Sequence, residues 1–268
     1  MAKNKRTAFF ISDGTGITAG SLGGLLAHFP ETEFDQIRIP FTDSIAKVED
    51  AQKRIVNAKM MTGARPIVIM SIGNKILRNE LKAVDAYYID LFDSFIHPLG
   101  IELDEQPLTR PGVSHSMKTN NYGSRMEAIN FALGHDDGMT HTGLNQAQVI
   151  LIGVSRSGKT PTSIYLAMQF GIKAANYPLI PEDFERGKLP PILKGYLDKI
   201  FGLTIKAERL HTLRSERRPN SHYASLSNCR QEIKQAENLM KKIRIPTADS
   251  TSKSVEELSA IIIQFMKN

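Results

Sequence analysis

The feature that most constrains this chain is a short stretch, residues 153–160, that matches the phosphate-binding pattern Gly-x-x-x-x-Gly-Lys-Ser/Thr at every fixed position. Apolar residues 147–152 precede it and indicate a buried strand, and residues 162–170 have the pattern of a helix that Gly171 ends. A strand–loop–helix order is what the pattern requires, because loop N–H groups and the positive end of the helix must face the same phosphates. The stretch therefore predicts a P-loop in an α/β nucleotide-binding domain.

The fixed positions of the loop each have a chemical reason. Gly153 and Gly158 allow the backbone angles and the close approach that phosphate oxygens need. Lys159 supplies a cation beside the terminal phosphates, and Thr160 supplies a hydroxyl ligand for Mg²⁺. We expect the whole stretch to bind a nucleotide, that is, Gly153, Val154, Ser155, Arg156, Ser157, Gly158, Lys159 and Thr160.

The second acidic element of a P-loop site is harder to find in this sequence. P-loop proteins usually carry a downstream strand that ends in Asp, and no apolar run followed by Asp is visible after the loop. Residues 87–90 (Tyr-Tyr-Ile-Asp) lie upstream, and we interpret them as part of a helix. The remaining candidates for a metal ligand or a general base are His135, Asp136 and Asp137, and an ordinary polar helix end is the alternative.

The rest of the chain alternates strands with helices, which predicts mostly parallel sheets. We expect strands at residues 7–12, 36–40, 67–72, 172–180 and 201–205. We expect helices at residues 17–28, 44–61, 75–84, 86–99, 122–133 and 221–243, and a last one after a capping box that begins at Ser254. The predicted fold class is α/β, with an N-terminal α/β domain (residues 1–120) and a C-terminal P-loop-type α/β nucleotide-binding domain (residues 121–268).

Two further stretches contain secondary candidates. Asp13 lies in a Gly-containing turn, residues 12–16, which either binds an anion or is an ordinary strand-to-helix turn. The basic stretch that contains Arg209, Arg214, Arg217 and Arg218 is either a solvated helix face or a clamp for a phosphate or a phosphorylated partner. Arg217 is the candidate that we retain from this stretch.

Composition excludes several classes of protein. The net charge of +6 is a mild basic excess without a basic run interleaved with aromatic residues, so nucleic acid is not an expected partner. No apolar run approaches the roughly 18 residues of a membrane span, and neither a signal peptide nor a membrane segment is expected. The single cysteine, Cys229, fits a reducing compartment, and the expected location is the cytoplasm.

Four motifs, taken together, resemble a known family. They are residues 11–16 (Ile-Ser-Asp-Gly-Thr-Gly), 135–138 (His-Asp-Asp-Gly), 153–163 (Gly-Val-Ser-Arg-Ser-Gly-Lys-Thr-Pro-Thr-Ser) and 201–205 (Phe-Gly-Leu-Thr-Ile). In this order they resemble the bifunctional kinase–pyrophosphorylase regulators of bacterial and plastid dikinases, over essentially the whole chain. One branch acts on pyruvate, phosphate dikinase and the other on phosphoenolpyruvate synthase. Residues 165–178 and 216–226 are similar to the synthase branch.

The resemblance implies an unusual pair of reactions. ADP would donate a phosphoryl group to a threonine of phosphoenolpyruvate synthase and inactivate it, and inorganic phosphate would remove that group as pyrophosphate. Lys159, Asp137 and His135 would be the catalytic residues. An acid such as Asp137 could accept the threonine proton, and the sequence leaves open which acid is the base. Mg²⁺ would bind at Thr160, and Asp136 remains a secondary candidate. The sequence leaves the oligomeric state open, a homodimer included.

Other functions remain open at this point. The loop fits ADP and ATP equally well, and the target could be pyruvate, phosphate dikinase. A P-loop kinase or NTPase of small molecules would turn over without a protein partner. A nucleotide-sensing module would bind ADP without any transfer.

Overall fold

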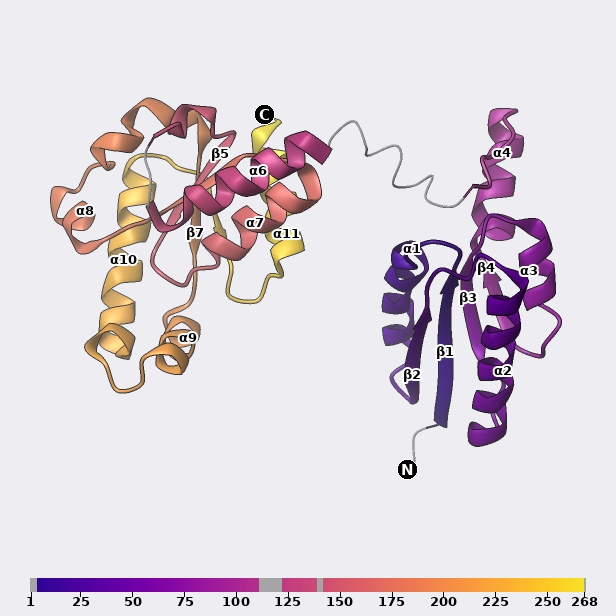
Figure 1. Cartoon of the computed structure of the whole chain (residues 1–268). Coiled ribbons are helices and arrows are strands. Elements are labelled where there is room, and N and C mark those ends of the chain that lie inside the picture. Colours follow the sequence, from indigo (N-terminus) through magenta and orange to yellow (C-terminus); the bar gives the residue numbers. More distant parts are fainter. Residues whose placement is uncertain (1–3, 111–121, 139–141, 268) are drawn as a thin grey trace. The chain divides into compact units, whose positions relative to one another are not determined.

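The chain divides into two compact units, residues 1–119 and 120–268 (Figure 1). Our structure is a computed structural model that describes residues 4–110, 122–138 and 142–267. The boundary that we predicted, between residues 120 and 121, lies outside the described residues.

The N-terminal unit is built on one parallel sheet with the strand order β2-β1-β3-β4. The strands are β1 (Asn4–Ser12), β2 (Thr32–Ile39), β3 (Ile67–Ser71) and β4 (Tyr87–Asp90). The helices are α1 (Ile17–Ser21), η1 (Leu22–His28), α2 (Ile45–Thr62), α3 (Lys75–Leu81), η2 (Phe92–Ile96) and α4 (His97–Leu103).

Helices cover both faces of this sheet because successive side chains of a strand point to opposite faces. Phe9 and Ile11 of β1 pack in the cluster that contains residues of α2 and α3. Ala8 and Phe10 pack in the cluster that contains Ala19 of α1. Figure 1 shows the resulting three layers, with α1 on one side of β1 and with α2 and α3 on the other.

Two expectations for the N-terminal unit were wrong in detail. Residues 86–99 are not one helix, since residues 87–90 form β4 and pair with β3 before η2 and α4 follow. The two tyrosines and the isoleucine favour a strand. Strand β4 is too short for its alternation of apolar and polar residues to be recognised in the sequence, and pairing with β3 stabilises it. The expected helix at 17–28 is regular only as far as Ser21, because the glycines that follow lower helix propensity.

The C-terminal unit contains a second parallel sheet, with the strand order β6-β5-β7-β8 (Figure 1). Its strands are β5 (Val149–Gly153), β6 (Ala174–Pro178), β7 (Ile200–Thr204) and β8 (Thr247–Asp249). Its longer helices are α6 (Tyr122–Gly134), α7 (Lys159–Phe170), α9 (Ala207–Arg217), α10 (Leu226–Lys242) and α11 (Val255–Met266). Short elements connect them, namely η4 (Asp136–Gly138), η5 (Leu144–Gln146), α8 (Pro181–Arg186), η6 (Pro191–Lys199) and η7 (His222–Ala224).

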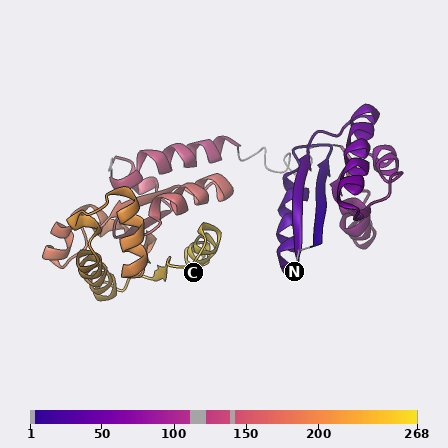
Figure 2. The same cartoon turned by 90° about the horizontal axis from the view of Figure 1, so that it is seen from below.

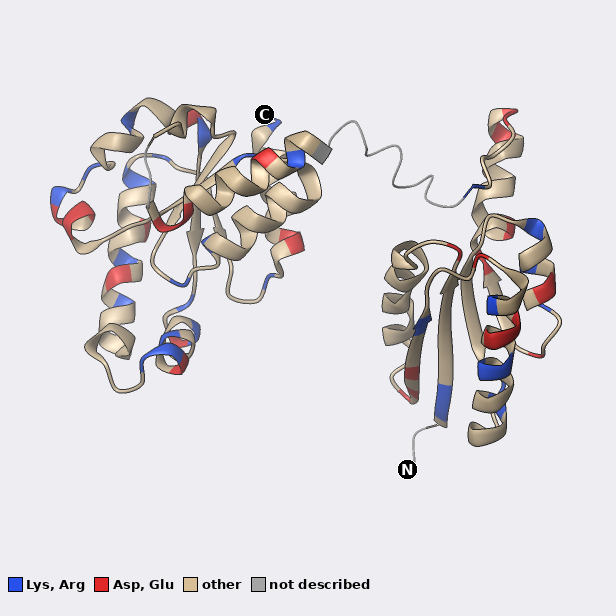
Figure 3. Cartoon of the chain, in the orientation of Figure 1, with Lys and Arg blue, Asp and Glu red and all other residues tan. Residues whose placement is uncertain are grey.

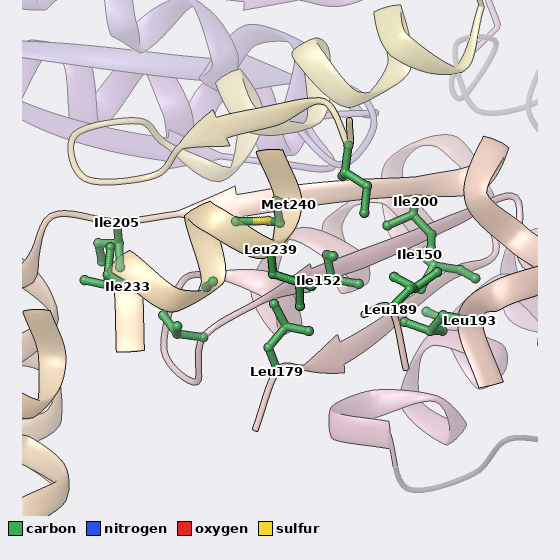
Figure 4. Packing of buried hydrophobic residues seen from close by; sticks show 14 of the residues in the cluster. Ile150, Ile152, Leu179, Leu189, Leu193, Ile200, Ile205, Ile233, Leu239 and Met240 are labelled. Carbon is green, nitrogen blue, oxygen red and sulfur yellow. The ribbon is translucent and has the colours of Figure 1, made fainter. Parts of the chain in front are cut away.

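All five residues of β5 are buried, and its side chains supply two cores. Ile150 and Ile152 lie with Leu239 and Met240 of α10, as Figure 4 shows. On the other face, residues of β5 cluster with residues of α7 and α11. Figure 2 shows α6 lying alongside α7, the helix that follows the P-loop.

Most expectations for this unit are confirmed. The capping box at Ser254 is present, with Ser254 accepting from the Glu257 backbone and Glu257 accepting from the Ser254 backbone. The expected helix at 221–243 is divided into η7 and α10, because Ser225 caps α10 by accepting from the Asn228 N–H. Strand β8 was not predicted from the sequence, since it has only three residues.

The helices of both units carry charged residues, as Figure 3 shows for α2, α9 and α10. In the part of the chain that the structure describes, no helix is both long enough and apolar enough to cross a membrane.

Candidate functional site

The P-loop connects the end of β5 to the start of α7, as the sequence predicted. Gly153 has a φ of 152°, and a Cβ at this position would lie 2.2 Å from the backbone oxygen of Leu203. Gly158 precedes the first residue of α7 with a φ of 91°. Residues other than glycine rarely adopt these backbone conformations, so both positions require glycine. The loop therefore presents its backbone at the N-terminus of a helix of 12 residues.

A cavity of about 450 Å³ opens over the loop. It brings together most of the residues that the sequence nominated, although they come from three separate stretches. The lining consists of Asp136, Asp137, Ser155, Arg156, Gly158, Lys159, Thr160, Pro161, Leu213 and Arg217. The upstream acidic pair, the loop and the basic stretch thus form one site.

Asp136 occupies the position next to the P-loop threonine. The hydroxyl of Thr160 donates to Oδ1 of Asp136 at 2.7 Å. Asn176, on β6, donates from Nδ2 to the same carboxylate oxygen and accepts from the backbone N–H of Asp137 at 3.0 Å. Asn176 was not predicted from the sequence, because its contacts join residues that are far apart in the chain.

These oxygens suit a magnesium ion. The carboxylate of Asp136 and the hydroxyl of Thr160 are hard oxygen ligands, which Mg²⁺ prefers. Mg²⁺ is commonly bound by one or two protein groups together with substrate phosphates. Asp136 is therefore placed where the downstream strand-ending Asp of other P-loop proteins would lie.

Lys159 is buried, and its ammonium group donates to the backbone oxygen of Val154 at 2.9 Å. Burial lowers the pKa of Lys159 to about 8, although the negative charges of Asp137 and Asp136 act in the opposite direction. A phosphate group beside this side chain would add further negative charge. An anionic ligand would therefore raise the pKa of Lys159 and favour its charged form.

Asp137 differs from its neighbour in exposure and in contacts. Its backbone is left-handed, with a φ of 48°, and its side chain is exposed at the cavity. The carboxylate forms no hydrogen bond to another described residue, whereas that of Asp136 is bonded to Thr160. Asp137 is thus available to accept a proton from a substrate hydroxyl.

His135 is not brought into the cavity, although the sequence nominated it together with the two acids. Nδ1 of its ring lies 2.9 Å from the backbone oxygen of Phe131, and Nε2 lies 3.0 Å from the backbone oxygen of Thr142. The ring is buried and stacks on Phe131, with 3.9 Å between the centroids. Its backbone oxygen also accepts from Asn176 N–H at 3.1 Å. These contacts fix the turn that carries Asp136 and Asp137.

The basic stretch of α9 has two different kinds of arginine. Arg217 lines the cavity, as expected of a phosphate clamp. Arg214 is fully buried, and its Nη2 donates to the backbone oxygen of Ser155 at 3.2 Å and to Glu232 at 2.7 Å. Arg214 lies four positions after buried Leu210, and both side chains lie on the inner face of α9.

Tyr223 adds a second contact between this region and the loop. Its hydroxyl lies 3.0 Å from Oγ of Ser155, and its backbone oxygen accepts from Nη1 of Arg214. The guanidinium of Arg214 also lies 4.1 Å from the centroid of the Tyr223 ring. Arg214 and Tyr223 therefore hold Ser155 in place from outside the cavity.

Asp13 lies in the N-terminal unit and lines a different cavity. Its carboxylate accepts from the Gly73 N–H at 2.6 Å. The turn that the sequence nominated as a second anion site therefore lines a cavity of the N-terminal unit, away from the P-loop residues in sequence.

A P-loop that follows a parallel strand, with a carboxylate on its threonine and a lysine at its helix start, defines a P-loop nucleotide-binding α/β protein. Comparison with known sequences narrows this class. The sequence profile of the kinase/pyrophosphorylase family matches residues 8–263, and the chain belongs to that family.

Several relatives share nearly the whole chain. A protein of Methylobacillus flagellatus is 62% identical over 260 residues, which cover 97% of this chain and 96% of the relative. A protein of Aromatoleum aromaticum is 54% identical over 265 residues, covering 98% and 96%. Both are provisionally named phosphoenolpyruvate synthase regulatory proteins.

Proposed function

We propose that this kinase/pyrophosphorylase is a bifunctional regulator of phosphoenolpyruvate synthase. In one direction it transfers a phosphoryl group from ADP to a threonine of the synthase and inactivates it. In the other direction it uses inorganic phosphate to remove that group and reactivates the synthase. The names of the relatives, at 62% and 54% identity over almost full length, support the choice of target.

The observation that carries the catalytic part of this proposal is the contact between Asp136 and Thr160 beside Lys159. It combines a phosphate-binding loop, a cation and a set of metal ligands in one cavity. Phosphoryl transfer depends mainly on positioning the phosphates and neutralising their charge. Mg²⁺, held by Thr160 and Asp136, would supply part of that neutralisation.

The kinase direction forms a bond between the threonine Oγ of the target and the β-phosphorus of ADP. The bond between that phosphorus and the bridging oxygen breaks, and AMP leaves. Asp137 takes the hydroxyl proton, because its carboxylate is exposed in the cavity. Lys159 and Arg217 offset the negative charge of the phosphates. His135 acts by fixing the turn rather than by touching substrate.

The pyrophosphorylase direction is phosphorolysis rather than hydrolysis. An oxygen of inorganic phosphate attacks the phosphorus of phosphothreonine, the bond to threonine Oγ breaks, and pyrophosphate forms. The proton that the threonine oxygen gains comes from the attacking hydrogen phosphate, and the carboxylate of Asp137 passes it on. The same loop and cations serve both reactions, since the attacking phosphate and the β-phosphate of ADP carry similar charge.

Labelled nucleotides test the donor, the acceptor and the target together. The purified protein is incubated with phosphoenolpyruvate synthase and Mg²⁺, with β-labelled ADP in one tube and γ-labelled ATP in another. We expect labelled phosphothreonine on the synthase from ADP alone. Adding unlabelled phosphate afterwards should release the label as pyrophosphate.

Other outcomes point to other functions. Label on pyruvate, phosphate dikinase and none on the synthase would move the target to that enzyme. Turnover without any protein acceptor would indicate a P-loop kinase or NTPase of small molecules, and ADP binding without transfer would indicate a sensing module.

A Lys159→Ala variant tests the use of one site for both reactions. We expect it to lose phosphorylation and phosphorolysis together. A variant that loses only phosphorylation and retains full phosphorolysis would show that the two reactions use different sites.

A further inference from the structure

The N-terminal unit has a cavity of about 600 Å³ at the carboxyl ends of its central strands. Asp13 follows β1 and Gly73 follows β3, and both line it. These two strands are neighbours, but the chain leaves β1 towards β2 and leaves β3 towards β4 on the opposite side. This is the topological switch point of the sheet, the place where open α/β sheets bind ligands.

Two close contacts to Gly73 hold the segments that line the cavity together. Oδ2 of Asp13 accepts from the Gly73 N–H at 2.6 Å, which joins the loop after β1 to the loop after β3. A Cβ on Gly73 would lie 1.9 Å from the backbone oxygen of Thr109. The segment that contains Thr109 therefore crosses directly over Gly73, and only glycine allows it to do so.

Arg78 stabilises the loop after β3, which lines this cavity. It is buried, and its Nη1 donates to the backbone oxygens of Ile72 and Gly73 at 3.0 and 2.9 Å. Its Nε lies 3.4 Å from buried Asp90 at the end of β4. The charge of Arg78 is thus compensated within the protein, and its role is to hold the loop after β3 in place.

Three other charged side chains of the cavity can still form an ion pair or a hydrogen bond with a ligand. Lys75 and Arg110 are exposed and form no ion pair with any described residue. The second oxygen of Asp13 forms no hydrogen bond to another described residue. Asp43, by contrast, is already bonded to Lys47 at 2.7 Å.

This combination of charges restricts the ligand. Asp13 and Asp43 would repel a ligand that is only anionic. Lys75 and Arg110 would repel a ligand that is only cationic. A ligand with a phosphate at one end and hydroxyl donors at the other satisfies both sets of groups. Burial raises the pKa of Asp13 even though the Gly73 N–H lowers it, so further hydrogen-bond donors would stabilise its carboxylate.

We propose that this cavity binds a small phosphate ester with free hydroxyl groups, whose phosphate contacts Lys75 and Arg110 and whose hydroxyls donate to Asp13. The site belongs to the N-terminal unit alone and contains no residue of the P-loop. It adds a ligand-binding function to the proposed transfer reactions and does not depend on them.

Calorimetric titration of the full chain tests the proposal. The chain carries Lys159→Ala, which removes the P-loop cation, and EDTA is present. The probes are ribose 5-phosphate, ribose and inorganic phosphate. We expect ribose 5-phosphate to bind at least about tenfold more tightly than either single-group probe, because it alone engages both ends of the site.

Variants of the cavity assign the two ends. Combined Lys75→Gln and Arg110→Gln should weaken ribose 5-phosphate binding by about tenfold or more. Asp13→Asn should reduce its advantage over inorganic phosphate to within about twofold. Lys53→Gln, an exposed lysine of α2 outside the cavity, is the matched control and should change nothing.

Three results would overturn the proposal. One is the absence of heat with ribose 5-phosphate at millimolar concentration. The second is binding that both sets of cavity variants leave intact, since the ligand would then lie elsewhere. The third is inorganic phosphate binding as tightly as ribose 5-phosphate, which would remove the role of Asp13. Unchanged melting temperatures of the variants exclude loss of folding as the cause of weaker binding.

Discussion

The hydroxyl of Thr160 donates to Oδ1 of Asp136 across 24 positions of sequence, at 2.7 Å. Asp136 does not end a strand, as the acidic partner of a P-loop usually does. It lies in the short turn after α6, upstream of the strand that leads into the loop. Asn176 of β6 holds its carboxylate in place. The carboxylate that contacts the P-loop threonine therefore comes from a residue that precedes the P-loop in the sequence.

Asp136→Asn tests this assignment. The amide can still contact Thr160, but it lacks the negative charge that a metal ligand supplies. We expect apparent Mg²⁺ affinity to fall by about 10- to 100-fold, with little change in melting temperature. The measurement is kinase activity as a function of Mg²⁺ concentration.

Asp137→Asn is the matched control, since it changes the adjacent carboxylate, which is not bonded to Thr160. We expect it to lower the rate at saturating Mg²⁺ by about 10²-fold or more, as loss of a general base does, and to leave Mg²⁺ affinity nearly unchanged. The opposite pattern in the two variants would exchange the two roles.

The two arginines of α9 should respond differently to substitution. Arg214→Met leaves Glu232 without its cationic partner and removes the contact to the Ser155 backbone. We expect the free energy of unfolding to fall by about 3 kcal/mol. Chemical denaturation measures this change, and an unchanged midpoint would contradict the bracing role of Arg214.

Arg217→Gln is expected to act on binding instead. Arg217 lines the cavity, and no ion pair joins it to the described part of the chain. Stability should stay within about 0.5 kcal/mol of the original chain. The nucleotide KM should rise about tenfold, because a charge-assisted contact to phosphate is lost. A large stability loss in this variant would show that Arg217 is structural.

Local features of the sequence were enough to predict much of this fold. The P-loop, the strand before it and the capping box at Ser254 each depend on neighbouring residues, and each is confirmed. The strands β4 and β8 were not predicted, because they are short and are stabilised by pairing with β3 and β7.

The site was predictable only as separate pieces. The sequence indicated the loop and the acidic pair, but not that Asp136 rather than Asp137 contacts Thr160. It could not separate buried Arg214 from Arg217 or find Asn176. These distinctions depend on contacts between residues that are distant in sequence, such as Arg214 to Ser155 and Asn176 to Asp136. His135 was a catalytic candidate because two acidic residues follow it, whereas its ring contacts two backbone oxygens.

Gly153→Ala tests the backbone requirement of the loop. The new Cβ would lie 2.2 Å from the Leu203 oxygen, in a backbone conformation that alanine rarely adopts. We expect a loss of about 3 kcal/mol or more in the free energy of unfolding. Gly195→Ala in the same unit meets no atom within 4 Å and should change stability by less than about 0.5 kcal/mol. Equal melting temperatures for the two variants would contradict the prediction.

The pKa of Lys159 predicts that nucleotide binding depends on pH. Burial holds this pKa at about 8, below the ordinary 10.5, so above pH 8 the amine of the free protein is mostly neutral. Bound phosphates favour the charged amine, and binding above pH 8 must therefore include uptake of a proton. The Kd for ADP should be constant from about pH 7 to 8 and then rise by up to about tenfold per pH unit.

The same shift predicts the direction of the stability change. Between pH 8 and 10.5 the unfolded chain keeps the Lys159 proton that the folded chain has lost, so the free energy of unfolding rises with pH across this window. Lys159→Met should remove that rise, and Lys159→Arg should remove the pH dependence of ADP binding, because arginine stays charged. Calorimetry at pH 9 in two buffers of different ionisation enthalpy measures the proton uptake directly. A constant Kd up to pH 9.5 without proton uptake would mean that Lys159 stays charged in the free protein despite its burial.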